Sequence, residues 1–233
     1  VDGLPRAFEG YRIVQLSDVH VGSLCPPEVG PGWVARASAL GADLAALTGD
    51  YVTMGSRFHE VAAETLAKLE AKDGIVAVLG NHDQAGGGEP LRTAMRDGGI
   101  RVLANEHFTI ARGDERIAIA GVDDVYTHRA DVDRTVDGAP LPIVALAHDP
   151  MLFPRLAERG VAFTMSGHTH WGQVGVPLVS DRVNLAARFF KFSAGVYKVG
   201  ASTLYVNPGL GTTGVPVRFG VPPEITLFTL QSA

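Results

Sequence analysis

The stretch RIVQLSDVH, residues 12–20, joins a short apolar run to a polar tip that contains Asp18 and His20. Four more apolar runs end in the same way: DLAAL before TGD, IVAVL before GNHD, IVALA before HDP, and AFTM before SGHTH. Apolar runs of this length are typical of buried strands in a parallel sheet. We therefore expect the strands to deliver their polar tips to one rim, which is the predicted active site.

The polar tips supply seven side chains that could bind metal: Asp18, His20, Asp50, Asn81, His148, His168 and His170. Oxygen and imidazole ligands without thiolate suit borderline divalent ions, with Mn²⁺ favoured and Zn²⁺ or Fe as alternatives. Seven ligands are too many for one tetrahedral centre. A carboxylate shared by two ions about 3.5–4 Å apart accounts for the number, so we expect Asp50 to bridge two divalent ions.

The order DxH, GD, GNHD, a lone His and GHTH resembles the calcineurin-like metallophosphoesterase superfamily over nearly the whole chain. The tail from Leu204 to Leu230 and the motif GHTHWGQ resemble its bacterial membrane-associated phosphodiesterase branch, which includes UDP-2,3-diacylglucosamine hydrolases. The resemblance implies a dinuclear phosphohydrolase. It assigns one ion to Asp18, His20, Asp50 and His170, and the other to Asp50, Asn81, His148 and His168.

The fold class expected from the residues is α/β, with strands and helices alternating through the first half of the chain. Strands are expected at 12–16 and 44–47, and helices at 33–40, 57–72 and 89–96. Further strands around 102, 108 and 117–120 have fewer helices between them, which indicates two stacked sheets flanked by helices. The resemblance implies the four-layer αββα sandwich. With 233 residues and 46% hydrophobic content, we expect residues 1–233 to form a single domain.

The expected reaction is attack on phosphorus by a metal-bound hydroxide, with a general acid that protonates the departing oxygen. His82 in GNHD is the predicted acid, and the resemblance assigns it the same role. Asp83 is expected either to orient the His82 imidazole or to cap the loop. The sequence lacks the GDxVDRG and GNHE motifs of protein Ser/Thr phosphatases. A protein phosphatase is therefore disfavoured. The expected function is that of a phosphodiesterase or pyrophosphatase, with a phosphomonoesterase or a catalytically silent metal-binding scaffold as alternatives; the complete ligand set and His82 argue against the scaffold.

The expected substrate is a small or lipid-linked phosphoester such as UDP-diacylglucosamine. Residues 173–200 place Phe189 and Phe190 among basic residues, so this segment could accept acyl chains or touch anionic lipid. The alternative is an ordinary hairpin packed on the core. Arg218 is a further predicted phosphate contact. Trp171 departs from the branch, which usually has glycine at this position.

Other features are less specific. Three glycines at 86–88 favour a flexible turn over a flap, and the motif GVDDVYTHRAD favours a charged turn over a cleft wall. The net charge of −5 disfavours extended nucleic acid, and nothing in the sequence indicates an obligate protein partner. No apolar run is long enough to cross a bilayer, so we expect a soluble, cytoplasmic chain. If an anchor or signal preceded Val1, the resemblance implies the cell envelope and peripheral membrane contact.

Overall fold

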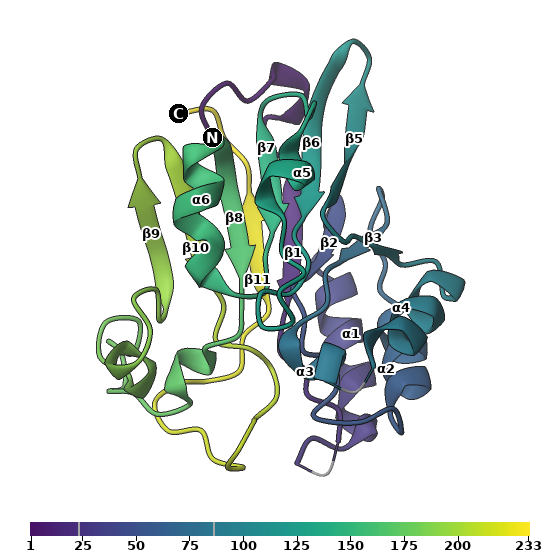
Figure 1. Cartoon of the computed structure of the whole chain (residues 1–233), viewed down its shortest axis with the longest axis vertical. Helices are drawn as coiled ribbons and strands as arrows, with labels where there is room; N and C mark the ends of the chain where they lie inside the picture. The colour runs from purple at the N-terminus through teal and green to yellow at the C-terminus, as the bar shows by residue number, and fades with distance from the viewer. Residues whose placement is uncertain (23, 86) are drawn as a thin grey trace.

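The computed structural model describes residues 1–22, 24–85 and 87–233, which form two mixed β-sheets packed face to face (Figure 1). The first sheet has the order β11-β1-β2-β3-β4. Its strands are β1 (Arg12–Leu16), β2 (Leu44–Leu47), β3 (Ile75–Ala77), β4 (Arg101–Val102) and β11 (Thr226–Thr229). The second sheet has the order β5-β6-β7-β8-β10-β9. Its strands are β5 (Glu106–Arg112), β6 (Glu115–Gly121), β7 (Ile143–Leu146), β8 (Val161–Ser166), β9 (Gly195–Val199) and β10 (Ser202–Val206).

Alternating side chains of the central strands explain why the sheets stack. In β1, Ile13 packs into the apolar cluster between the two sheets, whereas Val14 and Leu16 pack into the cluster beneath the helices. Successive side chains of a strand point to opposite faces, and a strand that is buried on both faces is apolar along most of its length. The one buried polar side chain of β1, Gln15, donates hydrogen bonds to Thr48 and Ser166. β2 likewise contributes Leu44 to the inner cluster and Leu47 to the outer one.

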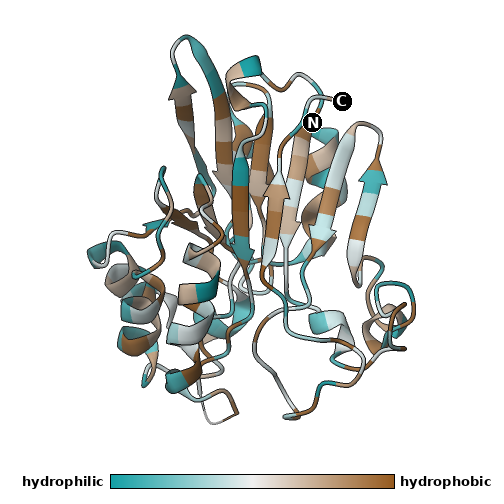
Figure 2. Ribbon diagram, turned by 180° about the vertical axis from the view of Figure 1, so that it is seen from behind, coloured by the Kyte–Doolittle hydropathy of each residue, from teal (hydrophilic) through white to brown (hydrophobic). Residues whose placement is uncertain are grey.

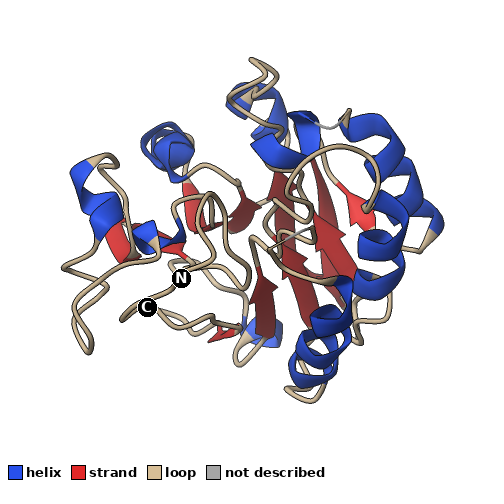
Figure 3. Cartoon of the chain, turned by 90° about the horizontal axis from the view of Figure 1, so that it is seen from below, coloured by secondary structure: helices blue, strands red, loops and turns tan. Residues whose placement is uncertain are grey.

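Helices cover both outer faces of the sheets (Figure 3). The first sheet is covered by α1 (Gly30–Ser38), α2 (His59–Leu66) and α4 (Gly88–Asp97), and the second by α5 (Val132–Val136) and α6 (Phe153–Glu158). Shorter elements are α3 (Asn81–Ala85) and the 3₁₀ turns η1 (Arg6–Phe8), η2 (Pro27–Val29), η3 (Pro150–Leu152), η4 (His170–Gly172) and η5 (Leu185–Arg188). The order helix, sheet, sheet, helix confirms the expected four-layer α/β architecture.

The expected boundaries of β1 and β2 are confirmed, but the helix expected at 57–72 is wrong in length. α2 ends at Leu66 because Lys72 and Asp73 leave the helix to donate backbone hydrogen bonds to the carbonyls of Ala42 and Asp43. Leu69 is buried in the turns that follow α2, and Ala67 and Ala71 are half-buried. Of the glycine-rich turn, Gly86 lies outside the described residues, and Gly87 has a left-handed φ of 84° directly before α4.

The strands β1, β2, β3, β7 and β8 each end within three residues of one of the polar tips. β1, β2 and β3 are parallel in one sheet, and β7 and β8 are parallel in the other. Their carboxyl ends meet at the same end of the sandwich, below β8 in Figure 1, while both termini lie at the opposite end. The topology thus brings residues from five distant parts of the chain to one place.

Candidate metal centre

An unusual backbone conformation is shared by five of the seven predicted ligands. They have left-handed φ values: Asp18 (51°), His20 (50°), Asp50 (56°), His168 (71°) and His170 (50°). Asp, Asn and His tolerate this region better than most residues, and such conformations cluster at functional sites. Here each one turns the chain sharply at the end of a strand, so that the side chain faces the other strand ends.

Glycines before the ligands allow the loops to come very close together. A Cβ atom on Gly80 would lie 2.1 Å from Asp50 Oδ1, and one on Gly167 would lie 2.1 Å from Asp18 Oδ2. Both distances are far below contact distance, so any larger residue would displace the carboxylate. The glycines of GNHD and GHTH are therefore explained by close packing against the neighbouring motifs.

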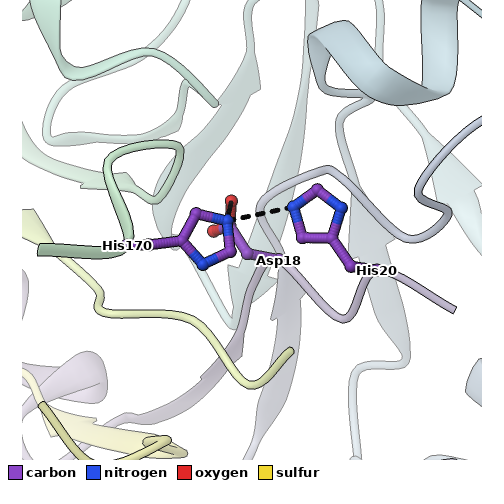
Figure 4. A group of neighbouring side chains, drawn as sticks. All are labelled: Asp18, His20 and His170. Atoms are coloured by element: carbon purple, nitrogen blue, oxygen red, sulfur yellow. Dashed lines mark hydrogen bonds and ion pairs between the residues drawn. The ribbon is translucent and has the colours of Figure 1, made fainter. Parts of the chain in front are cut away.

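Asp18, His20 and His170 form the first cluster of ligand atoms (Figure 4). His20 Nε2 lies 3.0 Å from His170 Nε2, and His170 Nε2 lies 3.3 Å from Asp18 Oδ1. All three side chains are buried. A carboxylate and two imidazoles whose polar atoms converge in a buried site are a donor set suited to a divalent ion.

Asp50, His148 and His168 form the second cluster. Asp50 Oδ2 lies 3.2 Å from His148 Nε2, and His168 Nδ1 lies 3.3 Å from the same nitrogen. Asn81 joins this cluster because its Oδ1 is 3.0 Å from His168 Nδ1. The structure therefore brings all seven predicted ligands together at one rim.

Asp50 stands between the two clusters. Its Oδ2 lies 3.2 Å from His148 in the second cluster and 3.6 Å from His20 in the first. Its other oxygen, Oδ1, accepts a hydrogen bond of 2.9 Å from the backbone amide of His82. This amide fixes the carboxylate so that Oδ2 faces both groups of imidazoles.

The electrostatics of the site favour a cation. Burial lowers the pKa of His20 and of His168 to about 4, so both imidazoles are neutral near pH 7 and offer lone pairs. Although burial opposes it, the Asp50 carboxylate raises the pKa of His148 to about 10. A divalent ion bound by His148 would release this proton, because a histidine must be deprotonated to bind a metal. These residues fit two divalent ions.

His82 lies beside the first cluster and not within its ligand set. Its ring packs edge-on against His20 with centroids 4.8 Å apart, and its Nδ1 lies 2.7 Å from the carbonyl oxygen of Thr53. If Nδ1 carries the hydrogen and donates it to Thr53, then Nε2 is left for a proton transfer. One ring nitrogen of His82 also lies within 4.8 Å of ligand atoms of His20 and Asp50.

The contacts of Asp83 correct one of its two expected roles. Its carboxylate accepts hydrogen bonds of 2.8–3.2 Å from four backbone amides, those of Asp50, Tyr51, Val52 and Gly80. Within the described part of the chain, the His82 imidazole is oriented by the Thr53 carbonyl and has no hydrogen bond to Asp83. Asp83 therefore caps the loop that carries Asp50 and does not orient His82.

Arg218 contacts the predicted ligand His170 on Nδ1, the ring nitrogen that does not face the first cluster. Its guanidinium donates to the carbonyl oxygens of Pro208 and Gly211, and Nη2 lies 3.3 Å from His170 Nδ1. These contacts occupy most of its donors, so the expected phosphate contact is not favoured, and Arg218 instead holds the loop near His170. The two predicted phenylalanines differ in position. Phe190 packs edge-on against His168 with centroids 5.5 Å apart, whereas Phe189 is 73% exposed.

Tyr126 is a residue that the sequence reasoning missed. Its hydroxyl lies 3.0 Å from His168 Nε2, on the opposite side of the ring from the Nδ1 that faces Asn81. A partner on the second nitrogen fixes the orientation of a ligand histidine. Tyr126 lies in the GVDDVYTHRAD turn, whose charged residues attracted attention while its tyrosine did not. An aromatic hydroxyl in a turn at the predicted rim was the available signal.

Comparison with known proteins identifies the family. The sequence pattern of the calcineurin-like phosphoesterases matches residues 11–172, which include all seven predicted ligands. The chain belongs to the calcineurin-like phosphoesterase family. It is therefore a metal-dependent hydrolase of phosphoric esters, and the wider family predicted from the motifs is confirmed. The narrower assignment to the UDP-diacylglucosamine hydrolases does not follow from this match.

Several relatives of this calcineurin-like phosphoesterase align along 94–100% of its length. It is 32% identical to the uncharacterized metallophosphoesterase YkuE of Bacillus subtilis, over 98% of this chain and 82% of the relative. It is 28% identical to the phosphodiesterase YaeI of Escherichia coli, over 94% of this chain and 82% of the relative. It is also 32% identical to a transmembrane protein with metallophosphoesterase domain of Danio rerio, covering 100% of this chain but only 56% of that protein. The chain thus spans about half the length of this last relative.

Solved structures agree on the fold. The NAD nucleotidase of Haemophilus influenzae superposes with a TM-score of 0.56 at 15% identity, over 85% of this chain and 45% of that one. The 5'-nucleotidase precursor of Thermus thermophilus superposes with a TM-score of 0.55 at 16% identity, over 95% of this chain and 54% of that one. At such identities the likeness shows the fold alone. None of the helices in the described ranges is both long and apolar enough to cross a membrane.

Proposed function

We propose that this phosphoesterase cleaves a phosphodiester or pyrophosphate bond at a centre of two divalent ions, Mn²⁺ first among them. The observation that carries the proposal is the position of Asp50, whose Oδ2 faces His148 on one side and His20 on the other. A carboxylate in this position could bind both ions of a two-metal centre, in which the ions lie about 3.5–4 Å apart. The proposed ligands are Asp18, His20, Asp50 and His170 for one ion, and Asp50, Asn81, His148 and His168 for the other.

The bound ions would supply positive charge at the phosphate oxygens and lower the pKa of water. The protein's own part is to hold the ligands rigidly. Asp83 fixes the Asp50 loop through four amides. Tyr126 fixes the outer nitrogen of His168, and Arg218 holds the loop behind His170. Rigid donors stabilise charge without having to reorganise during the reaction.

His82 is the proposed general acid. Its Nδ1 is engaged by the Thr53 carbonyl, so Nε2 is the nitrogen that would give a proton to the departing oxygen. A general acid accelerates the reaction most when the leaving group is a poor one. We therefore expect His82 to contribute much more with an alkyl leaving group than with nitrophenolate.

The proposed substrate class is a small or lipid-linked phosphoester, with UDP-diacylglucosamine as one example and with peripheral membrane contact. Support comes from the cavity beside the metal site. It has a volume of about 800 Å³, and its lining includes Phe190, Trp171, Tyr197 and Lys191. Phe190 in this lining packs edge-on against His168, and Trp171 directly follows the predicted ligand His170 in the chain. An aromatic wall with a cation suits a substrate that has both an anionic and an apolar part.

We also propose that residues 1–233 fold as one domain. The apolar cluster between the sheets contains Leu4 and Leu230 together with central strand residues such as Val144. Both ends of the chain are therefore part of the same core, as expected of a single cooperative unit.

Hydrolysis of bis-p-nitrophenyl phosphate with added Mn²⁺ tests the function. We expect turnover that exceeds turnover of the monoester p-nitrophenyl phosphate. Loss of a residue that only hydrogen-bonds to a metal ligand lowers activity by about 10–100-fold. Asp50→Asn changes a ligand itself, so its activity should fall by more than this. The variant Asp114→Asn, at an exposed turn, is the matched control and should keep full activity. No turnover with Mn²⁺, Zn²⁺ or Fe would favour a silent scaffold, and faster monoester turnover would favour a phosphomonoesterase.

The role of His82 has a separate test. His82→Asn should lose about 10²–10⁴-fold on a diester with an alkyl leaving group, and much less on bis-p-nitrophenyl phosphate. An equal loss on both substrates would contradict the general acid and indicate a role in metal binding or positioning.

A further inference from the structure

A large share of the exposed apolar surface lies in one part of the chain. Of the 17 large hydrophobic side chains that are exposed among the described residues, 12 lie between residues 174 and 219. Leu178 is fully exposed, and Phe219 is 62% exposed. Soluble monomers rarely expose a contiguous patch of this kind without a function. We define the apolar face as Val174, Val176, Leu178, Val179, Val183, Leu185, Phe189, Val215, Val217 and Phe219.

Nine of the ten residues of the apolar face, all except Phe189, lie in two segments that are joined by hydrogen bonds. Val174 pairs with Phe219, and Gly175 pairs with Asn184, in isolated β-bridges. The buried side chain of Gln173 donates to the carbonyls of Val215 and Val217 and accepts from the Thr213 amide. The hairpin 174–185 and the strand-like stretch 215–219 are therefore neighbours that are held in place, and their exposed side chains belong to one surface.

This surface lies next to the metal site. The hairpin follows η4, which begins at the predicted ligand His170, and the segment after η5 carries Phe190 against His168. In Figure 2 the apolar stretches in brown lie at the lower right, at the same end of the sandwich as the loops of the site. The cavity beside the metal site is lined by Arg182 and Val196 of the same region.

The charge of this region is opposite to that of the rest of the chain. Residues 174–219 contain one acid, Asp181, and five basic residues. The remainder has 15 Lys and Arg against 24 Asp and Glu. Three of the five cations, Arg182, Arg188 and Lys191, are exposed beside the apolar face. Apolar side chains flanked by cations are typical of surfaces that bind anionic bilayers.

We infer that the apolar face docks on an anionic lipid bilayer and presents the metal site to the membrane surface. A second copy of the chain is a poorer occupant, because a two-fold interface would bring the same exposed cations together. Docking on a bilayer would serve the proposed hydrolysis of a lipid-linked substrate, so the inference rests on the proposed function. Binding to the bilayer is nevertheless measured without any hydrolysis, so the two can fail separately.

Sedimentation of the full chain with vesicles tests the inference. We expect binding to vesicles of phosphatidylcholine with a quarter phosphatidylglycerol, and much weaker binding to phosphatidylcholine alone. Leu178→Ser with Phe219→Ser should weaken binding by at least about tenfold, because two large apolar side chains would no longer enter the bilayer. Arg182→Glu with Arg188→Glu should weaken it by more than the about fivefold expected for each lost cation.

Leu141→Ser is the matched control, because Leu141 is 69% exposed but precedes β7, at the opposite end of the sandwich. It should bind vesicles like the natural chain. Hydrolysis of soluble bis-p-nitrophenyl phosphate shows that the Leu178 and Phe219 double variant is folded. Urea unfolding shows it for the Arg182 and Arg188 double variant and for Asp50→Asn, which should bind vesicles while losing hydrolysis. The inference is overturned if the natural chain does not bind vesicles, or if the Leu178 and Phe219 double variant binds them fully. If vesicle binding is absent and the natural chain forms a dimer that this variant abolishes, the apolar face is an interface between two copies of the chain.

Discussion

Replacing Asp83 tests the loop that carries the central ligand. Its Oδ1 accepts the amides of Tyr51 and Val52, and its Oδ2 accepts those of Asp50 and Gly80. A buried donor left without a partner costs about 1–3 kcal/mol. Asp83→Ala leaves four donors unpaired, so we expect a loss of at least about 4 kcal/mol in the free energy of unfolding. That is a large part of the about 5–15 kcal/mol of an ordinary domain.

Asp83→Asn gives an intermediate case. Its single amide oxygen can keep one of the two pairs of donors, so about 2–6 kcal/mol should be lost. Urea unfolding of the metal-free chain measures both variants. Asp131→Ala is the matched control, because Asp131 caps α5 by accepting a single amide, that of Arg134, and should cost about 0.5–2 kcal/mol. If Asp83→Asn lost activity but kept its stability and bound metal, the loop-cap role would be wrong and Asp83 would act in the chemistry.

Three further predictions concern the walls of the metal site. Gly167→Ala should lower activity by at least about tenfold, because the new methyl displaces Asp18. Gly32→Ala, with open space around it in α1, should not, and equal activity in the two variants would contradict the packing argument. Tyr126→Phe should weaken Mn²⁺ affinity by about 10–100-fold in a titration, and an unchanged affinity would show that the hydroxyl does not position His168. Arg218→Lys should weaken Mn²⁺ retention during dialysis, whereas a change confined to KM would indicate direct phosphate contact.

Much of the fold was predictable because short stretches of the sequence determine its secondary structure. β2 is apolar throughout and β1 is mostly apolar, so their boundaries follow from hydropathy, and the polar tips follow directly. α2 was predicted too long because its end is set by Lys72, whose amide bonds to Ala42. Such a contact joins residues that are distant in sequence, so hydropathy cannot reveal it.

The candidate site divides in the same way. The seven ligand positions come from motifs, and their convergence follows from parallel strands that end together. The roles of the surrounding residues depend on three-dimensional contacts. Asp83 and Arg218 carry charges that suggested chemistry, yet both are occupied by backbone groups. Tyr126 has no motif of its own and is recognised only through the distance of its hydroxyl to His168.

The most direct test of the central claim is a crystal structure of the Mn²⁺-loaded chain, with anomalous scattering used to locate the ions. The account predicts two ions about 3.5–4 Å apart, with an oxygen of Asp50 bound to both, and one ion only in Asp50→Asn. A single ion in the natural chain, or two ions of which either is not bound by Asp50, would contradict it.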